Sequence, residues 1–424
     1  MRNVYELLKE NKELKDFVIS EEKKESFELF FVSDKLETVR KTDTLDTKIT
    51  VYVKNNETLG NYSFSLLSSD NKNTFEKKLN EAIKNAKLVN NKDYELPAGN
   101  KSNHNLKSNI KDYSYLELAN KINEIVIEAK KETNAKINAL EVFINKRITK
   151  IINSQGVNRK MNSYDVFIEA IPTYHNKNES YELYEAISFG EFDELKLKEE
   201  IVKSLNNVKA RANAKDIKLP DTIDVLLNIA EVRNFFMRIK ANLNYSSLYS
   251  RYSIYELNQK IIDNAKADKI TMKATSKLKG SNFQRPFDED GVLLSEKKLI
   301  ENNKVVGFYG SNRFAQYLGK EVTGNLPCFI VKKGTLDTND LKNNQYLECI
   351  SFSGLQVDLY QDYIGGEVRL GLYKDKNNII SVSGFTISGK VSDVLKDLHL
   401  SKDIDLYQNY KGPKYLLIKN MKIC

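Results

Sequence analysis

Apolar and polar residues alternate in several stretches of the first half of the chain, as they do in half-buried β-strands. Ile49, Val51 and Val53, for example, share one face of such a strand, while the residues between them share the other. The pattern predicts one set of strands over 27–32, 36–44, 48–54 and 61–67, and a second set over 139–145, 147–153, 164–171 and 181–189.

Apolar residues at spacings of three and four predict helices on both sides of each strand set. The first set lies between helices over 4–14 and 73–88. The second lies between one helix marked by Leu118, Ile122, Ile125 and Ala129 and another marked by Leu197, Ile201, Leu205 and Val208. The polar stretch 89–111 lacks periodicity and reads as a linker. Helix, four strands, helix therefore occurs twice, and structural duplication is a hypothesis that rests on element order alone.

Glycines gather in the second half of the chain, where 14 of the 18 follow residue 279 and interrupt short apolar runs. This distribution is typical of short strands joined by tight turns. We place a boundary at 215–220, which gives an N-terminal α+β domain over 1–219 and a β-rich domain over 220–424. The second domain is expected to be mostly antiparallel with a few helices, one of them over 231–243. The predicted class is α+β.

Composition excludes several classes of protein. A chain of 424 residues with 41% hydrophobic residues can bury a sizeable core. No run of about 18 uncharged apolar residues occurs and the N-terminus lacks a signal-peptide core, so a cytoplasmic location is expected. The net charge of +8 is spread along the chain, which argues against nucleic-acid binding. Cys328, Cys349 and Cys424 suggest buried, reduced thiols rather than disulfides or a zinc knuckle.

Histidines offer little support for a metal site or a general base. The three are isolated in sequence, and no H-E-x-x-H spacing exists. His104 and His175 are expected in exposed loops, and His399 in a capping or packing role. No nucleophile elbow or phosphate-binding loop is present either.

The acidic turn Phe287–Gly291 has two interpretations. Carboxylate oxygens at this spacing suit a hard cation such as calcium or magnesium. A hairpin turn, with Asp290 and Gly291 supplying positive φ angles, explains the same residues, and we favour it.

Several segments of the second half, read in order, resemble the TldD/PmbA family. The N-terminal order of helices and strands fits as well, so the resemblance covers nearly the whole chain. The matching segments are Arg285–Gly291, Leu299–Asn302, Gly310–Ser311, Arg313–Ala315, Leu318–Gly319, Thr323–Asn325, Gly365–Glu367, Ile387–Gly389 and Gly412–Pro413.

The resemblance implies a family of cytoplasmic zinc-dependent peptidases, once described as modulators of DNA gyrase, whose active form pairs two related subunits. The TldD-like subunit carries H-E-x-x-x-H on a helix in the second half and a cysteine ligand in a loop before the last strand. The PmbA-like (TldE-like) subunit lacks both. Here the corresponding helix, 230–240, has no histidine, and its apolar stripe belongs in a core. The loop before Gly412 has no cysteine, and Cys424 lies beyond the strand.

The resemblance is thus to the PmbA-like subunit, without catalytic or metal-binding residues of its own. We expect no cofactor in this chain, zinc in a TldD-like partner, and processing of flexible peptides by the pair. Neither a membrane nor direct contact with nucleic acid is expected. Two turns are expected to face substrate or partner, comprising Asp288, Glu289, Asp290, Gly291, Thr323, Gly324 and Asn325.

Two alternatives stay open at this point. One is a homodimeric, non-enzymatic binding or regulatory protein, acting for example on a topoisomerase system. The other is an autonomous enzyme that uses unrelated residues brought together in space.

Overall fold

The structure, a computed structural model, describes residues 2–33, 35–176, 179–343, 345–375 and 378–424, and confirms the α+β class. Up to residue 219 the elements run in the following order: α1 Arg2–Glu10, β1 Asp16–Val32, β2 Lys35–Asn55, β3 Thr58–Leu66, α2 Lys72–Ala86, β4 Asn91–Lys92, β5 Lys101–Asn105, a 3-10 turn Ile110–Asp112, α3 Tyr115–Thr133, β6 Lys136–Asn153, β7 Asn158–Asn176, β8 Glu179–Glu182, β9 Glu185–Phe189 and α4 Glu194–Ala212.

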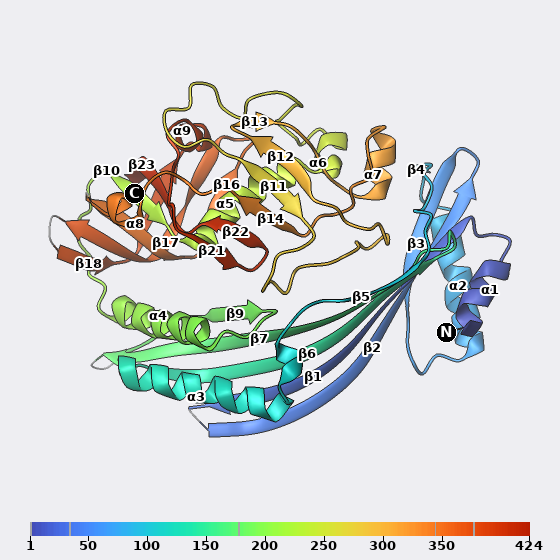
Figure 1. The fold of residues 1–424 in the computed structure, drawn as a ribbon, viewed down its shortest axis with the longest axis horizontal. Coiled ribbons are helices and arrows are strands. Elements are labelled where there is room, and N and C mark those ends of the chain that lie inside the picture. Colours follow the sequence, from blue (N-terminus) through green and yellow to red (C-terminus); the bar gives the residue numbers. More distant parts are fainter. Residues whose placement is uncertain (1, 34, 177–178, 344, 376–377) are drawn as a thin grey trace.

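The strands of this N-terminal part form one long, curved sheet (Figure 1). Among the described residues its order is β4-β3-β2-β1-β6-β7-β5, and β8 and β9 also pair with β7. At its centre β1 and β6 run antiparallel, with Glu25 opposite Lys146. From this pair the chain continues outward through β2 and β3 on one side and through β7 and β9 on the other. Duplication of a helix–strands–helix unit remains a hypothesis.

Strand boundaries differ from those predicted. The first block has three strands rather than four, because 36–44 and 48–54 are parts of β2 and 27–32 is the end of β1. In the second block 139–145 and 147–153 together form β6, while 181–189 is divided into β8 and β9. Residues 20–25 of β1 are serine and charged residues without apolar alternation, so hydrophobicity gave no signal there. Cross-strand ion pairs such as Lys23–Asp43 at 3.1 Å occupy these positions instead.

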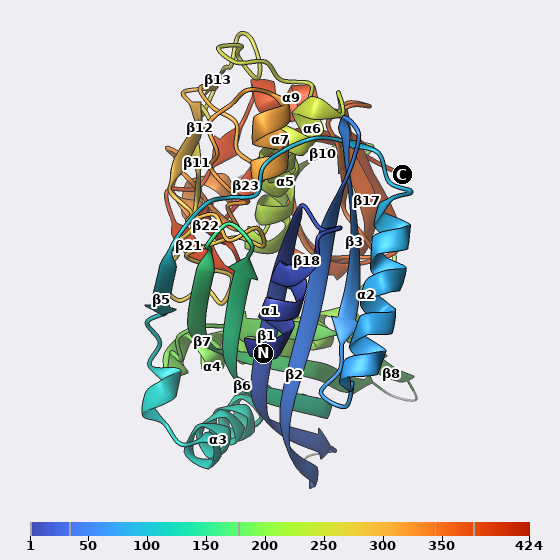
Figure 2. The same ribbon diagram turned by 90° about the vertical axis from the view of Figure 1, so that its right-hand side faces the viewer.

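Helices cover one face of the sheet. The pair α1 and α2 packs at one end, over Phe17, Ile19 and neighbouring apolar residues of β2. The pair α3 and α4 packs at the other end, over apolar residues of β6 and β7. On the opposite face, Val18 and Ile151 belong to a cluster that includes Phe287 from the C-terminal half. That face therefore contacts the C-terminal half (Figures 1 and 2). Helix α4 also contacts strands of the same half.

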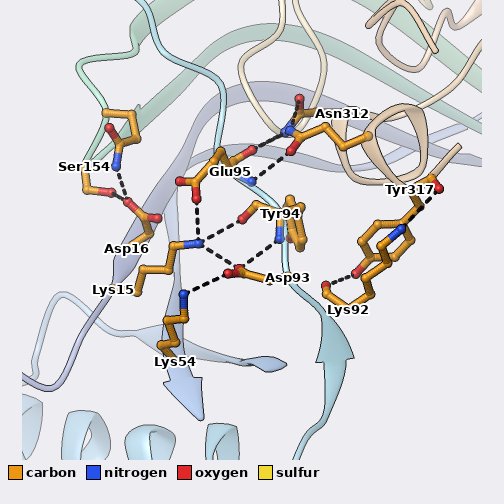
Figure 3. A network of polar contacts seen from close by, with 12 residues as sticks. Lys15, Asp16, Lys54, Lys92, Asp93, Tyr94, Glu95, Ser154, Asn312 and Tyr317 are labelled. Atoms are coloured by element: carbon orange, nitrogen blue, oxygen red, sulfur yellow. Dashed lines mark hydrogen bonds and ion pairs between the residues drawn. The ribbon is translucent and has the colours of Figure 1, made fainter. Parts of the chain in front are cut away.

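The stretch 89–111, predicted as a linker, is instead tied into the sheet by β4 and β5. Lys15 Nζ donates to Asp93 Oδ1 at 2.7 Å, to Glu95 Oε1 at 2.9 Å and to the carbonyl of Tyr94 at 3.3 Å (Figure 3). Asn312, from the C-terminal half, donates to the carbonyl of Glu95 at 2.7 Å. The pattern was missed because the side chains of β5 alternate only between exposed and half-buried, so its residues are polar throughout.

The C-terminal half contains short strands and helices in the following order: β10 Thr222–Leu227, α5 Ile229–Asn242, α6 Tyr245–Tyr249, β11 Met272–Thr275, β12 Lys297–Glu301, β13 Lys304–Val305, α7 Asn312–Tyr317, β14 Cys328–Val331, α8 Thr338–Leu341, β15 Tyr346–Phe352, β16 Gln356–Asp358, β17 Tyr363–Asp375, β18 Asn378–Val382, β19 Phe385–Gly389, α9 Val391–Lys396, β20 His399–Leu400, β21 Ile404–Tyr407, β22 Tyr410–Pro413 and β23 Leu416–Ile423.

These strands form two sheets around one core. The larger has the order β10-β15-β17-β19-β23-β20, and an additional β10–β23 pairing closes it on itself. The smaller has the order β13-β12-β11-β14-β22-β21. Pairing is antiparallel except between β10 and β15 and between β14 and β22, as expected for a mostly antiparallel region. Helix α5 contacts strands of both sheets and contributes Phe235 and Phe236 to their shared core. Among the described residues, no helix combines the length and the apolarity that a membrane crossing requires.

Candidate functional site

The acidic turn at 288–291 folds around the carboxylate of Asp288. Its Oδ1 accepts hydrogen bonds from the backbone N–H groups of Asp290, at 3.1 Å, and Val292, at 3.0 Å. Its Oδ2 accepts from the backbone N–H of Asn325 at 3.0 Å. The side chain is buried, and burial raises the pKa of Asp288 despite these three donors. Asp288 is therefore the link between the two turns that the sequence singled out.

The second turn, 323–325, packs tightly against the first. Thr323 is buried, and its hydroxyl accepts from the backbone N–H of Gly310 at 3.0 Å. Gly324 has a φ of +73°, and a Cβ there would lie 2.3 Å from a methyl group of Leu294 and 2.9 Å from Asp288 Oδ2. A side chain at Gly324 would thus separate the two turns.

Of the seven predicted residues, Glu289 and Asn325 are exposed, and Asp288, Gly291, Thr323 and Gly324 are buried within the chain. Both exposed residues line a pocket of about 320 Å³, which we call the first pocket. Its lining residues are Asn244, Phe283, Arg285, Asp288, Glu289, Tyr309, Asn325, Leu326 and Pro327. The structure therefore brings both predicted turns to one pocket.

The inner side of the acidic turn rests on the N-terminal sheet. Gly291 has a φ of +82°, and a Cβ there would lie 2.5 Å from Val157 of the sheet region. Asp290 and Gly291 were both expected to have positive φ angles. Only Gly291 has one, so the expectation for Asp290 was wrong. Burial, followed by the charges of Asp288 and Glu289, raises the pKa of Asp290 to about 7, although Arg313 opposes the shift. Asp290 therefore titrates near neutral pH.

A second pocket, of about 200 Å³, lies between the sheet and the segment 281–285. On its sheet side Arg147 donates from Nε to Asp165 Oδ1 at 2.7 Å and from Nη1 to Glu22 Oε1 at 2.8 Å. Phe283 and Arg285 line both pockets. The two pockets therefore flank one segment, and together we call them the groove. The second pocket is lined by Glu22, Leu106, Lys107, Arg147, Thr149, Met161, Ser163, Tyr164, Asp165, Gly190 and Ser281–Arg285.

Helix α5 corresponds to the metal-binding helix that the resemblance implies, and it is filled with core residues. Val232, Phe235, Phe236 and Ile239 are fully buried, as the apolar stripe predicted. Lys240, also buried, donates to the carbonyl of Leu326 at 2.6 Å and lies over the ring of Tyr309 at 4.7 Å. The ammonium group of Lys240 is thus held inside the C-terminal core by the Leu326 carbonyl and the Tyr309 ring.

Among the described residues, no group of three or more His, Cys, Asp or Glu side chains is arranged to hold a metal ion. A site for a hard cation was one interpretation of the acidic turn. The carboxylate of Asp288 in this turn instead accepts hydrogen bonds from backbone N–H groups. All three cysteines were expected to be buried. Cys328 and Cys349 are buried, but Cys424 is exposed, so the expectation was wrong for Cys424 alone. Burial raises the pKa of the Cys328 thiol to about 11, which disfavours the thiolate form that binds zinc.

The histidines lie far apart in the fold. His104, expected in an exposed loop, lies on β5 with its ring 5.9 Å from that of Phe287, and its Nε2 is 2.9 Å from Ser102 Oγ. Burial, followed by Arg159 and Lys277, lowers its pKa. His175 is exposed at the end of β7, in the β7–β8 hairpin. His399 lies on β20, and its Nε2 is 3.1 Å from Asp397 Oδ1.

Sequence reasoning missed a cluster of carboxyl groups where α4 and β9 meet the C-terminal half. Burial raises the pKa of Glu185 and raises that of Glu200 to about 7, with Glu185 itself contributing to the second shift. Lys196 of α4 crosses to Asp405 Oδ1 at 2.8 Å. Nothing in the sequence marks these residues, because glutamates on a helix ordinarily face solvent.

Solved structures share this fold over nearly their full length. The structure of TldE from Thermococcus kodakarensis matches 100% of this chain and 99% of its own with a TM-score of 0.79 at 16% identity. A candidate modulator of a DNA gyrase from Thermotoga maritima matches 96% of each chain with a TM-score of 0.75 at 17% identity. A candidate modulator of DNA gyrase from Bacteroides thetaiotaomicron matches 96% of this chain and 94% of its own with a TM-score of 0.74 at 14% identity. No curated protein sequence matches the chain.

The fold is therefore that of the TldE and gyrase-modulator structures. Residues 220–424 match the family described as PmbA/TldA metallopeptidase C-terminal domain. Residues 220–424 therefore carry the C-terminal domain of this family, as the ordered segments in the second half predicted, and the whole chain shares the fold of the TldE structure.

Proposed function

We propose that this chain is the PmbA/TldE-like subunit of a TldD/PmbA-type metallopeptidase complex that processes flexible peptides. Its own role is to bind peptide and to complete the complex, while zinc and the general base belong to a TldD-like partner. The observation that carries the proposal is the composition of α5, where apolar core residues and the buried cation Lys240 occupy the helix that would otherwise bind metal. A zinc site that activates water needs several ligands and an open position.

The groove supplies what a peptide-binding subunit needs. It combines aromatic and aliphatic surface, from Phe283 and Leu326, with charges of both signs, from Arg285 and Glu289. Peptide sites commonly join a few apolar anchors to polar groups that orient the chain. A flexible peptide can thus lie along the 281–289 segment without demanding one sequence.

A binding measurement on the groove tests this role. We expect Arg285→Glu to weaken binding of a fluorescently labelled, unstructured peptide on the order of tenfold, since Arg285 lines both pockets. Lys260→Glu is the matched control, because Lys260 is an exposed cation that lines neither pocket. Equal peptide affinity of both variants and the parent would place peptide binding elsewhere.

A second function follows from the descriptions of two similar structures as candidate modulators of DNA gyrase. In that case the chain is a regulatory protein that contacts a topoisomerase. This regulatory function would be indicated by a change in gyrase supercoiling activity when the purified chain is added in the absence of any TldD-like subunit. The proposal above predicts no such change.

A further inference from the structure

Arg159 of β7 is a buried cation whose hydrogen-bond acceptors are all uncharged. It is only 5% exposed. Its Nε donates to the carbonyl of Gly291 at 3.3 Å, and its Nη1 donates to Asn100 Oδ1 at 3.2 Å and to Ser102 Oγ at 2.9 Å. Among the described residues no carboxylate pairs with it, and burial alone lowers the pKa of its guanidinium. Because buried charges are ordinarily paired, this arrangement favours a bound anion.

Ser102 connects Arg159 to a second basic side chain, that of His104. The hydroxyl oxygen of Ser102 lies 2.9 Å from Arg159 Nη1 and 2.9 Å from His104 Nε2, so the two basic groups lie side by side. A guanidinium has no acceptor, so Ser102 Oγ accepts from Arg159 and directs its own proton to His104 Nε2. The lowered pKa of His104 keeps the imidazole neutral at neutral pH. Its proton then lies on Nδ1, where it can be donated to a ligand.

Lys277, in the turn after β11, adds a further positive charge. Its charge acts together with that of Arg159 to lower the pKa of His104, and within the described part of the chain no carboxylate opposes the two. Lys277 is exposed, while Ser102 and His104 are half-buried, so a small anionic group can reach them from solvent. We call Arg159, Ser102, His104 and Lys277 the basic site.

The basic site adjoins the second pocket of the groove. His104 pairs with Met161 in the register of β5 and β7, and Met161 lines that pocket. Leu106 and Lys107, which follow β5, line it as well. A chain that lies in the second pocket can therefore place one of its groups against His104.

We propose that the basic site binds a carboxylate group of a peptide that occupies the groove. This inference rests on the proposed function, which assigns peptide binding to the groove. The carboxylate comes either from the C-terminus of the peptide or from an Asp or Glu side chain. An ammonium and an imidazole N–H are donors that a carboxylate accepts from, and they are supplied by Lys277 and His104. The bound carboxylate also places a negative charge beside the buried guanidinium of Arg159.

Peptides that differ in a single carboxylate test the site. Three fluorescently labelled, unstructured peptides without other acidic groups are compared: one with a free C-terminus, one with a C-terminal amide, and one with a C-terminal amide and a single internal Asp. We expect the parent chain to bind at least one of the two carboxylate peptides about three- to tenfold more tightly than the plain amide. Which of the two gains affinity identifies the source of the carboxylate.

Lys277→Ala separates the basic site from the rest of the groove. Because Lys277 is exposed, its loss should leave the fold intact. We expect this variant to reduce the preference for the carboxylate peptide and to leave the affinity for the plain amide unchanged. Lys279→Ala is the matched control, because the Lys279 side chain is 86% exposed in the same segment and should leave all three affinities unchanged. Arg285→Glu, in contrast, should weaken all three peptides.

The imidazole of His104 reports on the site directly. A carboxylate bound beside it stabilises the imidazolium, so the carboxylate peptide should raise the pKa of His104 in an NMR titration, while the plain amide should not. The His104→Gln variant assigns the signal.

The two proposals fail in different ways. Equal affinity of the parent for all three peptides, an unchanged preference in Lys277→Ala, or a pKa of His104 that the carboxylate peptide does not raise would each overturn the basic site. Peptide binding by the groove would then still hold. Absence of binding for every peptide would overturn the proposed peptide-binding role and the basic site together.

Discussion

Asp288 has a mainly structural role, although it also lines the first pocket of the groove. Its carboxylate accepts from three backbone N–H groups and joins the acidic turn to the turn at Asn325. The sequence marked this residue as chemically interesting because it is acidic and next to a turn. Its partners could not be foreseen, since Asn325 is 37 residues away and no periodicity links the two.

Asp288→Ala is predicted to destabilise the chain. Three part-buried backbone donors would lose their acceptor, and the expected loss in free energy of unfolding is about 2–4 kcal/mol. Asp288→Asn keeps one carbonyl oxygen and should cost less. Urea denaturation of the two variants measures this order, and an alanine variant as stable as the parent would show that the two turns hold without the carboxylate.

Asp290 makes the free energy of unfolding depend on pH, and the raised pKa of its carboxyl group determines the sign of this dependence. Its folded-state pKa is raised to about 7, whereas an aspartate in an unfolded chain ionises near about 3.9. Between these values the folded chain holds a proton that the unfolded chain has released, so this group's contribution to stability decreases as pH rises through the window.

The variant Asp290→Asn removes that dependence. Relative to the parent, it should gain stability progressively between about pH 4 and about pH 7, the unfolded and folded pKa values of Asp290, and the gain should level off above this window. Thermal unfolding midpoints at several pH values measure the gain. A difference between variant and parent that does not change with pH would contradict the raised pKa.

Among the elements, the segment around Asp93 shows where polar contacts replace a hydrophobic signal. It was predicted as a linker because it lacks apolar periodicity, yet Lys15 and Lys54 both bind Asp93 (Figure 3). Burial acts to raise the pKa of Asp93, but the hydrogen bonds from Lys15 and Lys54 outweigh it and lower the pKa. The ionised carboxylate is therefore part of the fold.

Asp93→Asn is predicted to lower the free energy of unfolding at neutral pH by about 1 kcal/mol. Because the folded pKa is lowered, the stabilisation by Asp93 is present above the unfolded pKa and disappears as pH falls through the folded value. The gap between parent and variant should therefore close in acid. Denaturation at pH values on both sides of the carboxyl range tests this, and a gap that persists in acid would assign the loss to packing instead.

The sequence predicted helices better than strands, for a physical reason. Helix α5 was expected over 231–243 and is found at 229–242, because its apolar residues recur with helical spacing around a buried core. The long strands were divided or shortened in the prediction, because the middle of β1 is held by ion pairs between neighbouring strands. Such pairs leave no periodic trace in a single sequence.

For the whole molecule, the ordered segments of the second half identified the family, while the groove needed the structure. Its second pocket combines residues from β1, β6 and β7 with the segment 281–285. The positions that line it are hundreds of residues apart, as with Glu22 and Arg285, so their proximity depends on how the two halves pack. The raised pKa of Glu200 has the same origin.

The purified chain is predicted to bind no zinc. Lys240 and the apolar residues of α5 leave no cluster of ligands among the described residues. Dialysis against zinc followed by elemental analysis should therefore give less than one metal ion per chain, and a chelator should not shift the thermal unfolding midpoint. Stoichiometric zinc, released by chelator with a loss of stability, would require a site built from other residues.

The most direct measurement is cleavage of an unstructured peptide, in the presence of zinc, by this chain alone, by a TldD-like subunit alone and by the two mixed. The account predicts no cleavage by this chain alone and more cleavage by the mixture than by the TldD-like subunit alone. Chelator-sensitive cleavage by the pure chain, or a mixture no more active than the TldD-like subunit alone, would contradict it.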